Sequence, residues 1–180
     1  VTYQSGSRGK ILDRNGKILA YDEVTYNVRF YRDPNNTTPV DSMRYTHSLI
    51  EAIKIIEAGG GKIIDTFYIQ LASDGSFYYD FGTTSESAQA VRKKNFIEAC
   101  NFSNPELTAE EAYLILRESW RIPDDMTFSE ARKIMSVSQE AVLNSYRAFE
   151  GVTIANDVSL AVVTELDMRA SELVGIRTER

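Results

Sequence analysis

A tight turn between two pairs of aliphatic residues lies near the start of the chain and leaves this segment few ways to fold. Residues 11–12 and residues 18–19 are both Ile-Leu, and the tetrapeptide 13–16 between them is Asp-Arg-Asn-Gly. Aspartate in the first position and glycine in the last favour a type I turn, in which Gly16 takes a positive φ and forms a bulge. The sequence therefore predicts a β-hairpin over Lys10–Tyr21.

The charges beside this turn favour one register. A turn closed by Gly16 sets Asp13 opposite Lys17, and an opposite-charge pair across two strands is attractive. A two-residue turn at positions 15–16 would instead set Arg14 opposite Lys17, and like charges in this position repel. We therefore prefer the first register.

The preferred register places aliphatic residues on both faces of the hairpin. It pairs Leu12 with Ile18 and Ile11 with Leu19. A hairpin at the surface is normally apolar on one face only, so we expect this one to lie between two bodies of protein. The arginines at positions 8 and 14 would supply bidentate donors to such an interface. An ordinary hairpin is the open alternative, because Asn-Gly between apolar residues forms one in many settings.

The remaining patterns order the chain as strand, helix, hairpin, helices, strand, helix and strand. This order is typical of the α+β class rather than of regular βαβ units. We expect residues 1–31 and 149–180 to form a β-rich base, and residues 32–148 to form an inserted lobe of helices and a hairpin. The predicted strands are Thr25–Tyr31, Lys62–Leu71, Ser76–Phe81, Val152–Ala155 and Gly175–Arg180. Residues 156–159 are a predicted turn. The predicted helices are Ser42–Ala58, Ala88–Cys100, Thr108–Glu118, one opened by a capping box at Thr127, and Leu160–Met168.

Charge and composition narrow the classes of function. The 180 residues carry a formal net charge of −6 and show no basic stripe, so we expect no nucleic-acid partner. The single cysteine, Cys100, rules out an internal disulfide. No apolar run approaches the roughly 20 residues that cross a bilayer. Because the chain starts with Val1, we expect it to be a piece of a longer protein.

The hairpin lies within a longer motif. Nine of the thirteen positions from 8 to 20 fit the pattern RGxIxDRNGxxLA. This pattern resembles the opening motif of the non-catalytic module of class B penicillin-binding proteins, which is called the pedestal or dimerisation domain. The resemblance makes the matching residues the expected structural or interface motif: Arg8, Gly9, Ile11, Asp13, Arg14, Asn15, Gly16, Leu19 and Ala20.

Three further stretches extend the resemblance over most of the chain. Residues Phe149–Leu166 are similar to a strand-turn-helix of that family. Residues Thr108–Ile134 are similar to the helical insert of its Gram-positive, elongation-type members. Residues Glu172–Arg180 resemble the segment where the family has Leu-Pro-Gly-Val before a strand, although Val174 replaces the usual proline.

The resemblance implies a role without chemistry for this chain. The parent would be a membrane-anchored DD-transpeptidase that cross-links peptidoglycan on the extracytoplasmic face of the bacterial membrane. This module would position the transpeptidase domain and bind other cell-wall synthesis proteins or a second copy of itself, with no cofactor or metal. The membrane anchor would precede Val1, and the catalytic domain would follow Arg180.

A catalytic alternative rests on a short motif. Ser7-Arg8-Gly9-Lys10 fits the SxxK pattern of penicillin-recognising enzymes, in which the serine is the nucleophile and the lysine is one candidate for the group that activates it. That chemistry places serine and lysine at the start of a buried helix, whereas glycines occur within and directly before this stretch and a strand follows it. The companion SxN and KTG motifs are absent from the sequence. We therefore predict no catalytic residue; a serine acyltransferase that uses Ser7 and Lys10, and an unrelated α+β interaction domain, are the alternatives.

Other residues with chemical potential have simpler interpretations. His47, the one histidine, is expected to be solvated or locally hydrogen-bonded rather than a catalytic base. Cys100 is expected to be a buried, inert thiol, and it has no second cysteine with which to hold zinc. The acidic pairs at positions 110–111 and 124–125 lie at or before predicted helix starts, where negative charge is favourable without a metal.

Overall fold

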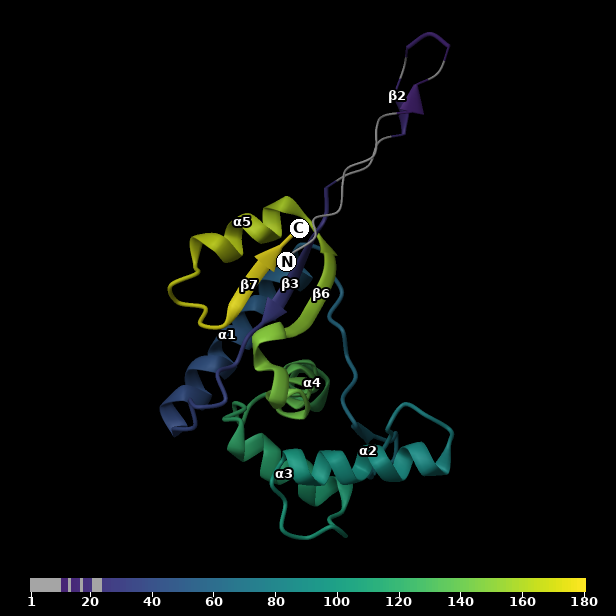
Figure 1. Ribbon diagram of the computed structural model, residues 1–180, viewed down its shortest axis with the longest axis vertical. Helices are drawn as coiled ribbons and strands as arrows, with labels where there is room; N and C mark the ends of the chain where they lie inside the picture. Colours follow the sequence, from purple (N-terminus) through teal and green to yellow (C-terminus); the bar gives the residue numbers. More distant parts are fainter. Residues whose placement is uncertain (1–10, 13, 17, 21–23) are drawn as a thin grey trace.

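The computed structural model describes residues 11–12, 14–16, 18–20 and 24–180. Figure 1 shows the elements stacked along one long axis, with the hairpin of β1 and β2 at one end, a three-stranded sheet in the middle, and helices α2 and α3 at the other end. In chain order the elements are β1 (Ile11–Leu12), β2 (Ile18–Ala20), β3 (Tyr26–Phe30), α1 (Pro39–Ala58), β4 (Ile69–Leu71), β5 (Phe77–Tyr79), α2 (Glu86–Ala99), α3 (Ala109–Ser119), α4 (Phe128–Leu143), the 3-10 helix η1 (Ser145–Glu150), β6 (Val152–Val158), α5 (Leu160–Met168) and β7 (Ile176–Glu179).

The central sheet is built from strands that lie far apart in the sequence. Its order is β6-β3-β7, and β3 runs antiparallel to both neighbours. Val28, in the middle of β3, pairs with Ala155 of β6 on one side and with Thr178 of β7 on the other. The sheet thus takes its strands from the two end regions of the chain, and the predicted α+β class is confirmed.

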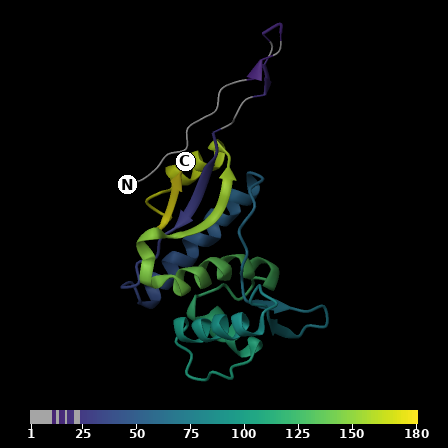
Figure 2. The same ribbon diagram turned by 45° about the vertical axis from the view of Figure 1, so that its right-hand side comes forward.

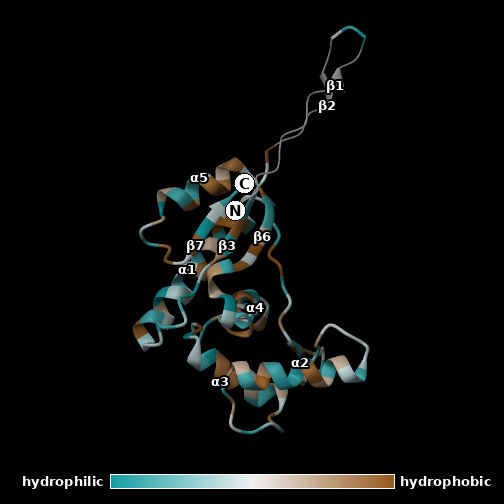
Figure 3. Cartoon of the chain, in the orientation of Figure 1, coloured by the Kyte–Doolittle hydropathy of each residue, from teal (hydrophilic) through white to brown (hydrophobic). Residues whose placement is uncertain are grey.

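Helices α1 and α5 cover one face of this sheet. Both pack against its strands and against each other (Figure 2). Val28 and Phe30 are buried, and the Phe30 ring meets the edge of Tyr45 of α1 with 5.6 Å between ring centroids. Figure 3 shows hydrophobic and hydrophilic residues alternating along α5, which buries Val162 and Leu166 while its other side meets water. Amphipathic helices of this kind shield one face of a small sheet from water.

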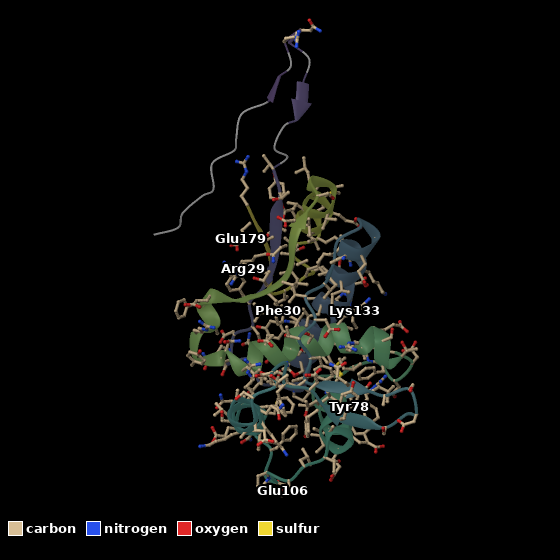
Figure 4. The ribbon with its side chains drawn as sticks, turned by 90° about the vertical axis from the view of Figure 1, so that its right-hand side faces the viewer. Arg29, Phe30, Tyr78, Glu106, Lys133 and Glu179 are labelled. Atoms are coloured by element: carbon tan, nitrogen blue, oxygen red, sulfur yellow. The ribbon has the colours of Figure 1, made fainter. Side chains whose placement is uncertain are left out.

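Helix α4 lies between the sheet and the distal lobe, the name used here for α2, α3, β4 and β5. It packs against α1 and β6 on one side and α2 on the other. All six residues from Ile134 to Gln139 are buried, so this part of the helix has no solvent-facing stripe. Lys133 of α4 forms an ion pair with Glu57 of α1, at 2.6 Å, on the side toward the sheet (Figure 4).

Stacked and edge-on aromatic rings fill the distal lobe. Phe77 of β5 stacks on Tyr113 of α3 with 4.9 Å between centroids, and Tyr68 meets Phe96 of α2 at 5.6 Å. Trp120, at the end of α3, is also buried. Aromatic pairs in these geometries contribute about 0.5–1.5 kcal/mol beyond the area that they bury, which suits a lobe whose only sheet is a short hairpin.

The predicted strand Lys62–Leu71 is wrong over most of its length, because β4 begins only at Ile69. The segment 62–68 is extended, but α4 side chains satisfy much of its backbone. Ser136 Oγ accepts from Thr66 N at 2.8 Å, Gln139 Oε1 accepts from Tyr68 N at 2.9 Å, and Gln139 Nε2 donates to Thr66 O at 2.9 Å. We call these three hydrogen bonds the α4 clasp. A helix here performs the role that a neighbouring strand would perform in a sheet.

Two other predicted boundaries differ from the structure by three residues. Strand β6 does not end at Ala155 but continues to Val158, because a bulge opposite β3 absorbs an extra residue and Asp157 takes a φ of 56°. Side chains of β3 and its approach hold Asp157 in place: Asn27 Oδ1 accepts from its backbone N, and Thr25 Oγ1 donates to its carboxylate. Helix α1 begins at Pro39 rather than Ser42, because Thr38 forms a capping box with its N3 residue.

The other predicted helix signals are confirmed. Thr108 and Thr127 each accept a hydrogen bond from the backbone N–H of a glutamate three residues later, and each glutamate side chain accepts one from the backbone N–H of the cap residue. Helix α5 spans Leu160–Met168, as predicted. The segment Thr25–Tyr31 contains β3, and the hairpin turn at Asp74-Gly75 joins β4 to β5.

The α4 clasp generates a stability prediction. Gln139→Leu keeps the side-chain volume but leaves the amide of Tyr68 and the carbonyl of Thr66 without their partner. Because an unpaired backbone group at a part-buried position costs free energy, we expect a loss of about 1–3 kcal/mol in unfolding free energy. Urea denaturation of both proteins measures it.

Ser129→Ala, at an exposed position of the same helix, is the matched control and should change the unfolding free energy by less than about 0.5 kcal/mol. Equal midpoints for Gln139→Leu and the control would show that the clasp contributes nothing to stability.

Candidate interaction surface

The hairpin that carries the sequence motif lies at the end of the molecule remote from the distal lobe (Figure 1). Strands β1 and β2 pair antiparallel, with Leu12 opposite Ile18 as predicted. Gly16 has a φ of 78°, which confirms the left-handed conformation expected at the end of the turn. Arg14 and Asn15 are exposed beside it. The turn therefore exposes a guanidinium and an amide group at this end of the molecule.

The second predicted pair of the hairpin is wrong. Ile11 lies opposite Ala20 rather than Leu19, because a bulge between the two pairs leaves Leu19 without an opposite partner. The expectation that Ile11 and Leu19 share one face depended on their being paired, so the observed pairing removes its basis. The motif residues Arg8, Gly9 and Asp13, the predicted partner Lys17, and the alternative catalytic residues Ser7 and Lys10 lie outside the described residues, as do the side chains of both strands.

Arg29 organises the face of the central sheet that α1 and α5 leave open. Its guanidinium donates to Thr153 Oγ1 at 2.9 Å and to the backbone carbonyls of Glu150 and Gly151. Its Nε also lies 3.5 Å from a carboxylate oxygen of Glu179, and Figure 4 shows the two side chains on the same side of the sheet. One side chain of β3 thus ties both neighbouring strands together. The sequence offered a signal for it: in the alternating strand Thr25–Tyr31, Arg29 falls on the face opposite Val28 and Phe30.

The chain enters and leaves this sheet at the same end. Asn27, near the start of β3, lies opposite Glu179, the last residue of β7. The distal lobe is at the other end of the sheet, beyond α4 (Figure 2). Whatever is joined to the start of β3 and to the end of β7 is therefore held side by side, and away from the distal lobe.

His47 takes part in a charged cluster rather than in a catalytic set. The side chain is exposed to solvent, as one of the two expected alternatives has it, and its Nε2 lies 3.0 Å from Glu172 Oε1, a partner 125 residues away in the sequence. Arg169 donates two hydrogen bonds to the same carboxylate, at 2.7 and 3.0 Å. These hydrogen bonds, from Arg169 first and His47 second, lower the pKa of Glu172 from 4.5 to about 2. Within the described ranges no hydroxyl or thiol is hydrogen-bonded to His47, so the pair has no nucleophile to activate.

The remaining reactive groups of the described segments also show no arrangement for catalysis. Cys100 is half-buried rather than buried as expected, and this burial raises the pKa of its thiol to about 12, so the thiol stays protonated near neutral pH. Burial likewise raises the pKa of Tyr79 to about 12, while its hydroxyl donates to the carbonyl of Leu107. Among residues 24–180 and the described parts of the hairpin, no group of acidic, histidine and cysteine side chains could hold a metal ion.

The Glu172 cluster generates a pH prediction. A carboxyl whose pKa is about 2 when folded and 4.5 when unfolded stabilises the fold fully above pH 4.5, and this contribution is lost as the pH falls through about 2. Glu172→Gln should therefore lower the melting temperature at pH 7, and the difference from the unmodified chain should shrink below pH 4.5. Thermal melts between pH 7 and pH 2 measure this.

Glu106→Gln is the control, because Glu106 is exposed and forms no ion pair within the described residues. It should leave the melting temperature unchanged at every pH. A difference for Glu172→Gln that stays constant from pH 7 to pH 2 would contradict the assignment.

The family model described as "Penicillin-binding Protein dimerisation domain" matches residues 3–180. No curated protein sequence matches the chain significantly.

Proposed function

Because the chain belongs to the penicillin-binding protein dimerisation domain family, we propose that it is the non-catalytic pedestal that positions a transpeptidase domain. The parent in this proposal is a class B, elongation-type peptidoglycan DD-transpeptidase. The pedestal sets the distance and orientation of the catalytic domain, and it offers surfaces to other cell-wall synthesis proteins or to a second copy. The motif from Arg8 to Ala20 is the proposed interface with the catalytic domain.

The observation that supports this proposal most directly is the common end at which the chain enters β3 and leaves β7. A domain joined beyond Glu179 would start beside the segment that leads to the hairpin, because Asn27 and Glu179 are paired. The Arg29 network ties β6 and β7 to β3 and so fixes the direction in which the chain leaves. A rigid exit of this kind is what a positioning module requires.

We keep the division into a base and an inserted lobe as part of the proposal. Residues 1–31 and 149–180 would form the base, and residues 32–148 the inserted lobe. Helix α1 belongs to the second range by sequence but packs on the sheet, and α4 joins it to the distal lobe. The lobe would then be anchored to the base through two helices rather than through a flexible linker.

The proposed location is the extracytoplasmic face of the bacterial membrane, with an anchor in the parent. In the residues that the structure describes, no helix has the length and apolar character of a membrane span. The pedestal itself would contact the membrane only through that anchor.

The positioning role predicts that Arg14→Glu acts only when the catalytic domain is present. Arg14 is exposed at the hairpin turn, so the substitution should change the unfolding free energy of this chain by less than about 0.5 kcal/mol. In the full-length protein it should lower the melting temperature of the catalytic domain and reduce peptidoglycan cross-linking in cells.

Lys94→Glu makes the same charge change at an exposed position of α2 and should have neither effect. If both variants behave alike in the full-length protein, the hairpin is not an interface with the catalytic domain.

The non-catalytic role predicts that this chain forms no covalent adduct with benzylpenicillin. Intact-mass measurement after incubation should show only the unmodified mass, whereas the full-length transpeptidase under the same conditions should gain one penicilloyl group. A stoichiometric adduct that disappears in Ser7→Ala would overturn the proposal in favour of the serine acyltransferase.

A further inference from the structure

Two adjoining pockets lie where the end of β3, the start of β7 and η1 meet. The first has a volume of about 420 Å³ and is lined by residues that include Tyr31, Arg32, Phe149 and Arg177. The second, of about 310 Å³, shares Arg32 and Pro34 with the first and continues over apolar residues of α4 such as Val142. A ligand that fills both must be extended, because one small ion would occupy only a fraction of this space.

The backbone around the first pocket is closely fitted. Tyr31 N donates to Gly175 O at 2.7 Å, and Gly175 has a φ of 84°. A Cβ at position 175 would lie 2.6 Å from the carbonyl oxygen of Tyr31, so only glycine allows this approach. The Tyr31 ring is therefore attached to a closely packed backbone.

An arginine guanidinium lies over each of the two tyrosine rings that line the first pocket, those of Tyr31 and Tyr45. The guanidinium carbon of Arg177 lies 4.9 Å from the centroid of the Tyr31 ring, and that of Arg32 lies 4.8 Å from the centroid of the Tyr45 ring. Stacking fixes the plane of a guanidinium while its N–H groups at the edge stay available. Arg32 makes one long hydrogen bond, to Ser42 Oγ at 3.4 Å, and neither arginine forms an ion pair with a carboxylate of the described residues.

The charge of the pockets is opposite to that of the whole chain. Two guanidinium groups face one carboxylate, that of Asp33, which already accepts a hydrogen bond from the backbone N of Asn35. The chain as a whole carries a net charge of −6. Burial lowers the pKa of Arg32, and the nearby carboxylate of Asp41 offsets this effect only in part. Carboxylates are the groups that a pair of oriented guanidiniums binds best in a bidentate manner.

An aromatic side chain stands at the edge of the first pocket. Phe149 of η1 is 80% exposed, which is unusual for so large an apolar group. Together with Val142 in the second pocket it offers apolar contact on either side of the arginines. The ligand should therefore combine negative charge with apolar side chains.

We propose that these pockets bind an acidic peptide segment of a partner protein, in which a carboxylate lies between Arg32 and Arg177 and neighbouring apolar side chains contact Phe149 and Val142. The inference rests on the proposed function insofar as a pedestal binds partner proteins. It does not involve the hairpin or the catalytic domain, so a failure here leaves the positioning role to be judged by its own test.

The experiment selects peptides from a displayed library of random twelve-residue sequences, with this chain as bait. Selection should enrich peptides in which aspartate or glutamate neighbours an aliphatic or aromatic residue. A synthetic copy of an enriched peptide, measured by fluorescence anisotropy, should bind Arg177→Gln and Arg32→Gln about tenfold or more weakly, the loss expected for one charge-assisted pair. Raising the salt concentration should weaken binding of the unmodified chain.

Three variants separate binding from folding. Phe149→Ala removes an exposed ring and should weaken binding while leaving the melting temperature unchanged. Arg177→Lys keeps the charge but loses the planar fork, so its affinity should fall between those of the unmodified chain and Arg177→Gln. Lys94→Gln, which removes a charge from α2, should bind the peptide normally.

Several outcomes would overturn the proposal. These are enrichment of basic or uncharged peptides, no enrichment above the Arg177→Gln bait, or equal affinity for the unmodified chain and Phe149→Ala. Competition by inorganic phosphate at concentrations equal to those of the peptide would also overturn it, because the site would then recognise a simple anion.

Discussion

The buried middle of α4 is the constraint on which the two halves of the molecule depend. Its six consecutive buried residues face the sheet and α1 on one side and the distal lobe on the other, so neither half has a complete core without it. Its polar residues are part of this role. Gln139 is fully buried. Its amide group hydrogen-bonds to the backbone of segment 62–68, which has no neighbouring strand there, and these bonds offset the cost of burying the amide. Packing and hydrogen bonding therefore act through the same turn of helix.

Much of the fold was predictable because its signals are local. Capping boxes at Thr108 and Thr127 mark helix starts through contacts between residues three apart, and α5 was located within its true bounds. The errors occur where distant residues decide. Segment 62–68 has the composition of a strand, but it is paired with side chains of a helix some 70 residues away. Asp157 looks like a turn residue, but Asn27 and Thr25 hold it within a bulged strand.

The candidate surfaces also combine features that have a local sequence signal with features that depend on residues far apart in the sequence. The turn at Gly16 and the family motif around it are contiguous in sequence and could be recognised there, whereas the bulge that displaces Leu19 could not. Arg29 could be assigned to the open face from strand alternation, but its partners on β6 and β7 come from folding. The paired arginines near η1 had no sequence signal at all, because Arg32 and Arg177 are brought together only by the β3–β7 pairing.

The shared end of β3 and β7 also determines how the sheet would respond to mechanical load. Tension applied between the start of β3 and the end of β7 would act across Asn27 and Glu179, perpendicular to the strands and along their hydrogen bonds. The ladder would then open one pair at a time from that end, instead of resisting with all its pairs together as it would under shear. Arg29 spans β6, β3 and β7 only two residues further along, so it is the first side chain that such an opening would have to break. A module that joins two bodies through these strands would on these grounds yield more easily when the bodies are pulled apart than when they are sheared along the strands.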